Sequence, residues 1–247
     1  MATQRHLSNA PITEAVIDVR VQLEPKFDTA RLLYTKQSLG GLYPHSEEQK
    51  SATVALQAKQ TLEATTTDLG LHGVLHRSSD GRELVQCRLD GFTFNRLSPY
   101  ISWEDMLPKA LSAWEEYSKA TLPVGVTRVA VRYINHVPVA GSLRDALNSV
   151  ESRVTLPTGI PGTLRTYGFR AVIEHPDGAT NANIVQAVEP GAARETYKVL
   201  LDIDVFRNRM LTPVTRDQLA AEFEDLRKIK NSIFFSILTQ ETVDRLA

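Results

Sequence analysis

Two segments of the chain alternate between apolar and polar residues in the manner of a strand with one buried face. Between Ala15 and Leu23 every odd position is apolar, whereas Asp18 and Arg20 fall on even positions. Between Val126 and Val137 the same period-two pattern returns. It places Val129, Val131 and Tyr133 on one side and Arg128, Arg132 and His136 on the other. Because successive side chains of a strand point to opposite faces, both segments are predicted to be strands of a half-buried sheet.

The order of elements around these two strands recurs. Residues 12–23 can be aligned with residues 126–137, and each segment precedes a helix-like stretch, three strand-like stretches and a longer helix. The pattern predicts an α+β fold of two duplicated β-α-β-β-β-α halves, residues 1–123 and 124–247, packed as one globular unit. We expect a mostly antiparallel sheet of about eight strands with helices on one side. The two matched strands should be antiparallel neighbours.

The remaining elements of the first half are predicted from the period of the apolar residues and from the glycines and prolines that end each element. A helix is predicted after Pro25, ending at Gly40-Gly41, and strands are predicted at 50–60, 68–77 and 83–96, the last with a bulge at Gly91. Ser102 and Asp105 have the spacing of a helix cap.

The second half contains a short helix at 143–150, a Pro/Gly-rich loop at 155–163, a hairpin of residues 165–174 and 181–189, and a strand at 197–206. A long amphipathic helix begins either at Thr212-Pro213 or at Thr215, which Gln218 follows at capping-box spacing. The apolar stripes of the two long helices predict four buried side chains, those of Trp114, Phe223, Leu226 and Ile233.

The charge balance and composition of the chain bear on the partners and the location that can be expected. The 247 residues carry 28 basic and 29 acidic side chains, a formal charge of −1, which favours neither nucleic acid nor an anionic membrane as a partner. The sequence contains no apolar run of transmembrane length, and its polar start does not resemble a signal peptide, so a cytoplasmic location is expected. The single Cys87 lies on an apolar strand face and is interpreted as a buried, inert thiol.

The polar face of the two matched strands is the best candidate site. Aligning the halves places Asp18 opposite Arg132, and the face also carries Arg20 and His136. One interpretation is a cross-strand ion pair on a solvated face, worth under about 1 kcal/mol. The other is a concave floor on which Asp18, Arg20, Arg132 and His136 bind a ligand or a peptide.

Other constellations favour structural roles. His72 and His76 share a strand face but would lie about 13 Å apart, too far to bind one metal ion. Asp202 and Asp204 are interpreted as a solvated strand face rather than a Mg²⁺ site. The basic residues of the last helix, among them Arg227, Lys228 and Lys230, are interpreted as a solvated helix face.

The sequence contains no dinucleotide, P-loop, nucleophile-elbow or zinc-protease motif. No catalytic residue, metal site or cofactor is therefore predicted.

Three segments resemble a sporadically distributed bacterial protein family of unknown function. They are residues 9–20 (NAPITEAVIDVR), residues 91–103 (GFTFNRLSPYISW) and residues 132–135 (RYIN). The resemblance implies no activity or catalytic residues. The patchy distribution of such a family fits genes that move horizontally, as defence and antitoxin genes do.

The first functional hypothesis is a non-catalytic binding or interaction protein, such as a bacterial defence or antitoxin component, with a protein or small-molecule partner. The alternative is a nucleotide- or phosphate-binding enzyme that uses the charged floor of the sheet. A third hypothesis is a homo-oligomer that associates through the C-terminal helix.

Overall fold

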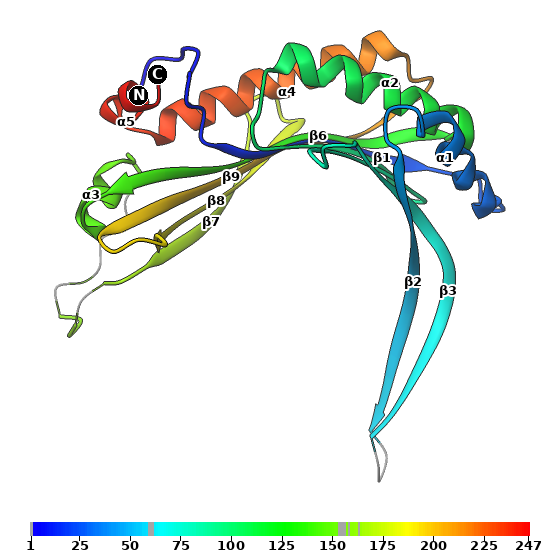
Figure 1. The fold of residues 1–247 in the computed structure, drawn as a ribbon, viewed down its shortest axis with the longest axis horizontal. Coiled ribbons are helices and arrows are strands. Elements are labelled where there is room, and N and C mark those ends of the chain that lie inside the picture. The colour runs from blue at the N-terminus through cyan, green and yellow to red at the C-terminus, as the bar shows by residue number, and fades with distance from the viewer. Residues whose placement is uncertain (1, 59–61, 153–156, 158, 163) are drawn as a thin grey trace.

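The computed structural model describes residues 2–58, 62–152, 157, 159–162 and 164–247. In these residues nine strands form one antiparallel sheet in the order β2-β3-β4-β5-β1-β6-β9-β8-β7. Two long helices cover one face of the sheet, whose ends bend away from them to form an arch (Figure 1). The α+β class and the antiparallel sheet are confirmed.

The first half contributes β1 (Ile12–Gln22), β2 (His45–Ala58), β3 (Leu62–Arg77), β4 (Glu83–Arg88) and β5 (Gly91–Leu97). The single strand predicted at 83–96 was wrong, because β4 and β5 pair with each other as an antiparallel hairpin. The phase change at Gly91 therefore marks a turn rather than a bulge. A side chain could not fit at Gly91, since an added Cβ would lie 2.2 Å from the carbonyl oxygen of Val19 on β1.

The second half contributes β6 (Gly125–Ala140), β7 (Tyr167–Glu174), β8 (Thr180–Pro190) and β9 (Thr196–Leu211), with the short helix α3 (Leu143–Asn148) after β6. The predicted hairpin is confirmed as β7 and β8. Positions 155, 156, 158 and 163 of the predicted loop lie outside the described residues, as do positions 59 and 60 of the predicted strand at 50–60. The described residues of the loop, 157 and 159–162, are in neither a helix nor a strand.

β1 and β6 are antiparallel neighbours at the centre of the sheet, as predicted. Their register places Asp18 opposite Ala130 and Arg132 opposite Val16. Asp18 and Arg132 therefore do not face each other directly.

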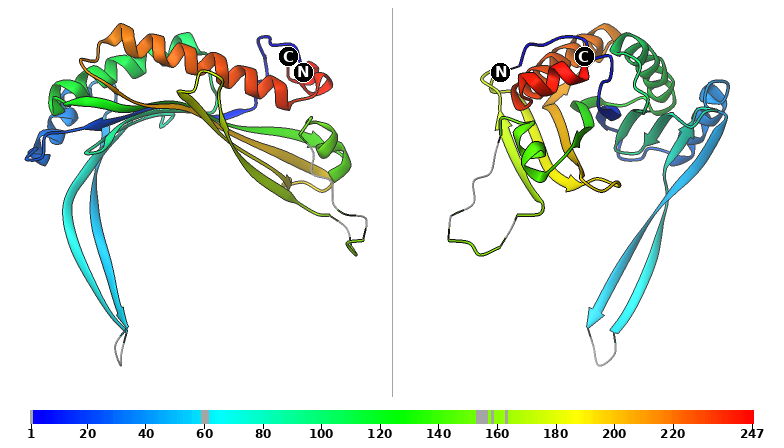
Figure 2. Two further views of the ribbon diagram at one scale, coloured as in Figure 1. Left: turned by 180° about the vertical axis from the view of Figure 1, so that it is seen from behind. Right: turned by 60° about the vertical axis from the view of Figure 1, so that its left-hand side comes forward.

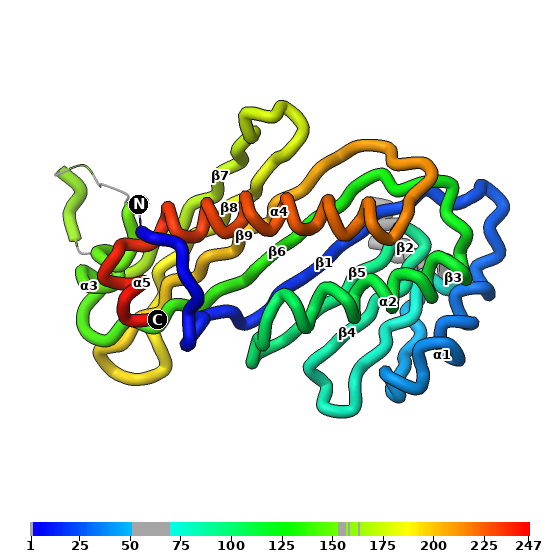
Figure 3. Tube along the Cα trace, turned by 90° about the horizontal axis from the view of Figure 1, so that it is seen from above, coloured from blue at the N-terminus to red at the C-terminus, as the bar shows by residue number. Residues whose placement is uncertain are grey.

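The helices begin where the capping signals predict. The first half contains the short 3₁₀ segment η1 (Thr29–Leu33), the short helix α1 (Tyr34–Leu39) and the long helix α2 (Trp103–Thr121). At the start of α2 the Ser102 side chain accepts a hydrogen bond from the Asp105 amide at 3.1 Å. Thr215 and Gln218 form a full capping box on α4 (Arg216–Ile237), and α5 (Gln240–Leu246) ends the described chain. α2 and α4 lie over the same face of the sheet (Figure 3).

The core lies between these helices and the sheet. Trp114, Phe223 and Leu226 are buried as predicted. Ile233 is only partly buried, because the register of α4 places Phe234 and Phe235 in the core instead.

The two halves differ by one strand, since four strands follow α1 or η1 before α2 and three follow α3 before α4. The internal duplication is therefore not confirmed. The opposite, concave face of the sheet is bordered by the long hairpin of β2 and β3, which extends well beyond the other strands (Figure 2). None of the helices in the described part of the chain is both long and apolar enough to cross a membrane.

Candidate functional site

The predicted polar face exists, but its ion pairs differ from the predicted ones. Asp18 accepts from four side chains, those of Arg128 (2.9 Å), Thr93 (2.9 Å), Arg20 (3.2 Å) and Arg88 (3.4 Å). These partners come from β6, β5, β1 and β4. Asp18 is thus the centre of a hydrogen-bonded cluster that ties four neighbouring strands together.

Arg132 pairs with Asp202 on β9 instead of Asp18. The contact is bidentate, with Nε 2.7 Å and Nη2 2.6 Å from the two carboxylate oxygens. Aligning the halves correctly identified neighbouring strands, but an alignment contains no information about register. The predicted Asp18–Arg132 pair was therefore wrong.

His136 lies on the same face but farther along β6. It is six residues beyond the position opposite Asp18, or about 20 Å at 3.3 Å per residue. Burial lowers its pKa, and Lys198 lowers it further. Asp18 and Arg20 are bonded to each other, and Arg132 lies two residues along β6 from the position opposite Asp18. His136 lies four residues farther along β6, so the four predicted residues are spread along the face rather than gathered at one point.

The arginines of this face are satisfied within the protein. Arg128 donates to both Asp18 and Asp204 and stacks over the Phe206 ring at 4.5 Å. Arg20 and Arg88 both pair with Asp90 in addition to Asp18. Since each of these three guanidiniums already has a carboxylate, the cluster around Asp18 carries little uncompensated positive charge.

The opposite face of the sheet contains a different kind of site, a pocket of about 590 Å³ between the start of α2 and the middle of α4. Its walls are residues 4–12, residues 98–104, Tyr133 and Asn135 of β6, and α4 from Arg227 to Phe235. The N-terminal segment, which runs beside α5 (Figure 3), contributes residues 4–12 to the walls. It is held there by the Asn9 amide, which donates to the Leu246 carbonyl at 3.0 Å, and by the pair of Arg5 with Asp244. The volume is within the range of small-molecule sites.

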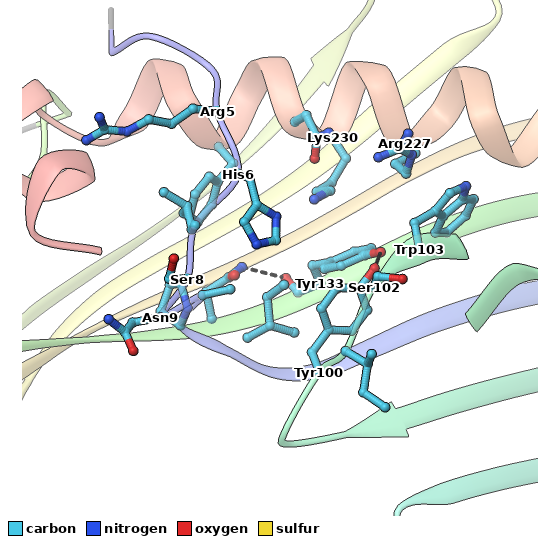
Figure 4. A pocket seen from close by; sticks show the side chains of 18 of the residues that line it. Arg5, His6, Ser8, Asn9, Tyr100, Ser102, Trp103, Tyr133, Arg227 and Lys230 are labelled. Atoms are coloured by element: carbon cyan, nitrogen blue, oxygen red, sulfur yellow. Dashed lines mark hydrogen bonds between the residues drawn. The ribbon is translucent and has the colours of Figure 1, made fainter. Parts of the chain in front are cut away.

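Lys230 extends from α4 into this pocket above Tyr133 (Figure 4). The residue is only 7% exposed, and its ammonium lies 3.8 Å from the centroid of the Tyr133 ring. Within the described residues it has no carboxylate and no hydrogen-bond acceptor. Burial, followed by the charge of Arg227, lowers the pKa of Lys230 to about 7.

Aromatic side chains surround the lysine. The hydroxyls of Tyr100 and Tyr133 lie 2.9 Å apart, and burial raises the pKa of Tyr100 to about 12 and that of Tyr133 well above its usual value. Arg227 lies over the Trp103 ring at 5.4 Å. The buried Trp103 Nε1 has no acceptor among the described residues. Two donors without acceptors among the described residues, the Lys230 ammonium and the buried Trp103 Nε1, therefore line one pocket.

The charged side chains of the walls are mostly basic. Arg5, Arg227 and Lys230 are opposed by the single carboxylate of Glu104. Arg227 is itself paired with Glu224, with Nη2 2.9 Å from Oε1. Lys230 is thus the cation of the pocket that lacks an internal counter-charge.

Sequence reasoning missed this pocket, although two signals pointed to it. Lys230 was assigned to a solvated basic face, but it falls four residues after Leu226 and four before Phe234, on the apolar stripe of α4. In addition, the three segments that carry the family resemblance all contribute to the walls, through Asn9–Ile12, Ser98–Trp103, and Tyr133 with Asn135. Residues far apart in the chain meet here.

The other candidate residues have structural positions. Cys87 is fully buried, and burial raises the pKa of its thiol to about 12. His76 is buried, with Nε2 3.0 Å from the Thr35 hydroxyl. A search of the described residues finds no group of three or more His, Cys, Asp or Glu side chains that could hold a metal ion.

No protein-family model matches the chain, and neither does any curated protein. Among solved structures, the crystal structure of the di-domain ARO/CYC StfQ from the steffimycin biosynthetic pathway aligns over 95% of this chain and 97% of its own chain. The identity is 10% and the TM-score is 0.19, so this alignment carries no argument about function.

Proposed function

We propose that the protein is a non-catalytic binding protein and that its ligand is a small molecule held in the pocket between α2 and α4. The observation that carries this proposal is Lys230, a residue 7% exposed whose ammonium lies in the pocket and has no counter-charge among the described residues. A buried unpaired cation costs stability, and a bound ligand can offset that cost.

The pocket supports binding better than catalysis. The Tyr100 and Tyr133 hydroxyls have raised pKa values, so both remain protonated near neutral pH. Lys230 titrates near neutral pH, but among the described residues no acid or base is hydrogen-bonded to it, and the one carboxylate of the described walls, that of Glu104, lies at the exposed rim. We therefore assign these side chains to recognition.

The concave sheet face supports the alternative, a phosphate-binding enzyme, less well. Phosphate sites need basic side chains that are free to pair with the ligand. Arg20, Arg88, Arg128 and Arg132 all pair with carboxylates of the same face. Binding of a protein partner to this face, and a role in bacterial defence, stay predictions from the sequence.

A neutral aromatic dye tests the pocket directly. N-phenyl-1-naphthylamine fluoresces when it enters an apolar site, and we expect saturable binding to the native protein. Asn231→Trp places a large ring in the pocket wall and should weaken binding about tenfold or more, whereas Ala221→Trp on the exposed side of the same helix should not. Absence of saturable binding, or equal binding by the Asn231→Trp variant, would contradict the proposal.

A further inference from the structure

Lys230 is the basis for naming the class of ligand. Its residue is 7% exposed, its ammonium faces the Tyr133 ring, and the described residues offer it no acceptor. By contrast, the neighbouring Arg227 is bonded to Glu224 on its own helix. The position beside Lys230 is thus a place where a negative group would be the only counter-charge.

The rest of the pocket specifies the body of the ligand. Tyr100, Tyr133 and Trp103 line one side, and Phe234 and Phe235 of α4 line the other. Aromatic side chains on two sides reduce the contact of an ion pair with water, which strengthens the pair. A bare inorganic ion would leave most of the 590 Å³ pocket and its aromatic surface without contacts.

We propose that the pocket selects an organic anion, a molecule with an acidic group next to an apolar or aromatic body, and that Lys230 binds the acidic group. This inference rests on the proposed function and specifies its ligand. Trp103 Nε1 is a second donor without a partner in the same walls.

Ligand binding at Lys230 should involve a proton. The free ammonium has a pKa of about 7, and an anion beside it favours the charged form. The charged or titratable groups around Lys230 are Arg227 on α4, Tyr133 on β6, Tyr100 and Glu104 at the start of α2, and Arg5 and His6 of the N-terminal segment. Affinity for a permanently charged anion should therefore fall as pH rises above about 7.

Two dyes of matched shape separate this inference from the proposed function. 8-Anilino-1-naphthalenesulfonate carries a sulfonate that is ionised at all working pH values, and N-phenyl-1-naphthylamine has the same rings without it. We expect the native protein to bind the sulfonate more tightly at pH 6. Lys230→Met should weaken sulfonate binding about tenfold or more while changing binding of the neutral dye less than about twofold.

Lys228→Met is the matched control, because the Lys228 side chain is 66% exposed on the same helix. It should leave both dyes unaffected. Native affinity for the sulfonate should fall about tenfold between pH 6 and pH 8.5, and Lys230→Met should remove that dependence apart from any contribution of His6.

The outcomes are distinguishable. If neither dye binds saturably, the proposed function fails. If both dyes bind equally well and Lys230→Met changes neither, the pocket binds ligands but the organic-anion inference is overturned. Preference for the sulfonate that survives in Lys230→Met would also overturn it, because another group would then bind the acid.

Discussion

The concave face and the pocket on the helical face differ in whether their charged side chains are paired. On the concave face, Asp18, Asp90, Asp202 and Asp204 pair with arginines of neighbouring strands. On the helical face, Lys230 is buried deeper than any of those arginines and has no acidic partner among the described residues. The four aspartates at the centre of the concave face thus have basic partners within the protein, whereas the Lys230 ammonium has no acidic partner among the described residues.

This difference indicates which face needs an external partner. Partly exposed ion pairs contribute about 0–1 kcal/mol each, and the concave face can be explained by sheet stability alone. Burial of an ammonium costs several kcal/mol unless a counter-charge accompanies it. Within the described protein the Tyr133 ring offsets part of that cost for Lys230, but no carboxylate does, so an anionic ligand is the simplest reason for its position.

The largest expected effect comes from removing the support beneath the pocket. Phe223 is 1% exposed and anchors α4, the helix that carries Lys230, against the sheet. Phe223→Ala should lower the free energy of unfolding by about 3–5 kcal/mol through lost burial and a cavity. Chemical denaturation measures this change.

Ile233→Ala is the control, because Ile233 lies on the same helix but is only partly buried. Ile233→Ala should lower the free energy of unfolding by no more than about half as much as Phe223→Ala does. An unchanged unfolding midpoint for Phe223→Ala would mean that α4 does not hold the pocket in place.

The strands of the fold could be predicted because alternation is a local signal. Residues 15–23 and 126–137 each show it, and their adjacency followed from matching the two patterns. The hairpin of β4 and β5 was missed because a two-residue turn and a bulge both shift the phase of alternation by a similar amount. Register was missed as well, because it depends on tertiary packing between Asp18, Arg128 and their neighbours.

The pocket could not be predicted from periodicity, because its walls come from four separate parts of the chain. Lys230 was the local exception that could have revealed it, as a charged residue on the apolar stripe of α4. Because Lys230 was grouped with the basic residues Arg227 and Lys228, its position on the apolar stripe was overlooked. A charge at a core position of an amphipathic helix is a better indicator of a site than a charge on its polar side.

The concave face provides the next test of the comparison. Asp18 accepts from Arg128, Arg20, Arg88 and Thr93, so Asp18→Asn leaves part of a buried cluster without its counter-charge. We expect a loss of about 2–3 kcal/mol in the free energy of unfolding, with dye binding in the pocket unchanged. Asp90→Asn should cost under about 1 kcal/mol, since the Asp90 side chain is 52% exposed.

Replacement of Lys230 should increase the free energy of unfolding, whereas the substitutions of Phe223 and Asp18 should decrease it. Lys230→Met replaces a buried cation with an apolar side chain of similar shape, and should raise stability by about 1–3 kcal/mol at pH 6–7 while weakening anion binding. A higher melting temperature together with lost affinity is the signature of a residue kept for binding. Destabilisation would show that the lysine has a structural partner.

The pH dependence gives that prediction a second readout. Unfolded lysine has a pKa of about 10.4, whereas Lys230 has one of about 7 in the folded protein. Between these values the unfolded chain binds more protons, so the contribution of Lys230 to stability rises with pH from about 7 to about 10.4. The advantage of Lys230→Met should therefore be greatest near pH 6 and shrink toward pH 10.

The smallest effect is expected for Arg132→Glu. The Arg132 side chain is 45% exposed, and its pair with Asp202 is screened by water, so the variant should change the free energy of unfolding by no more than about 1 kcal/mol. The new carboxylate would lie beside Asp202 and Asp204, so the change should be destabilising and should diminish in high salt.

Because Arg132 points away from the pocket, the affinity for both dyes should remain within about twofold. A tenfold loss of sulfonate binding would break the distinction between the two faces. If instead a partner isolated with the native protein is lost by Arg132→Glu and retained by Lys230→Met, the concave face is a second and independent interaction surface, as the sequence predicted.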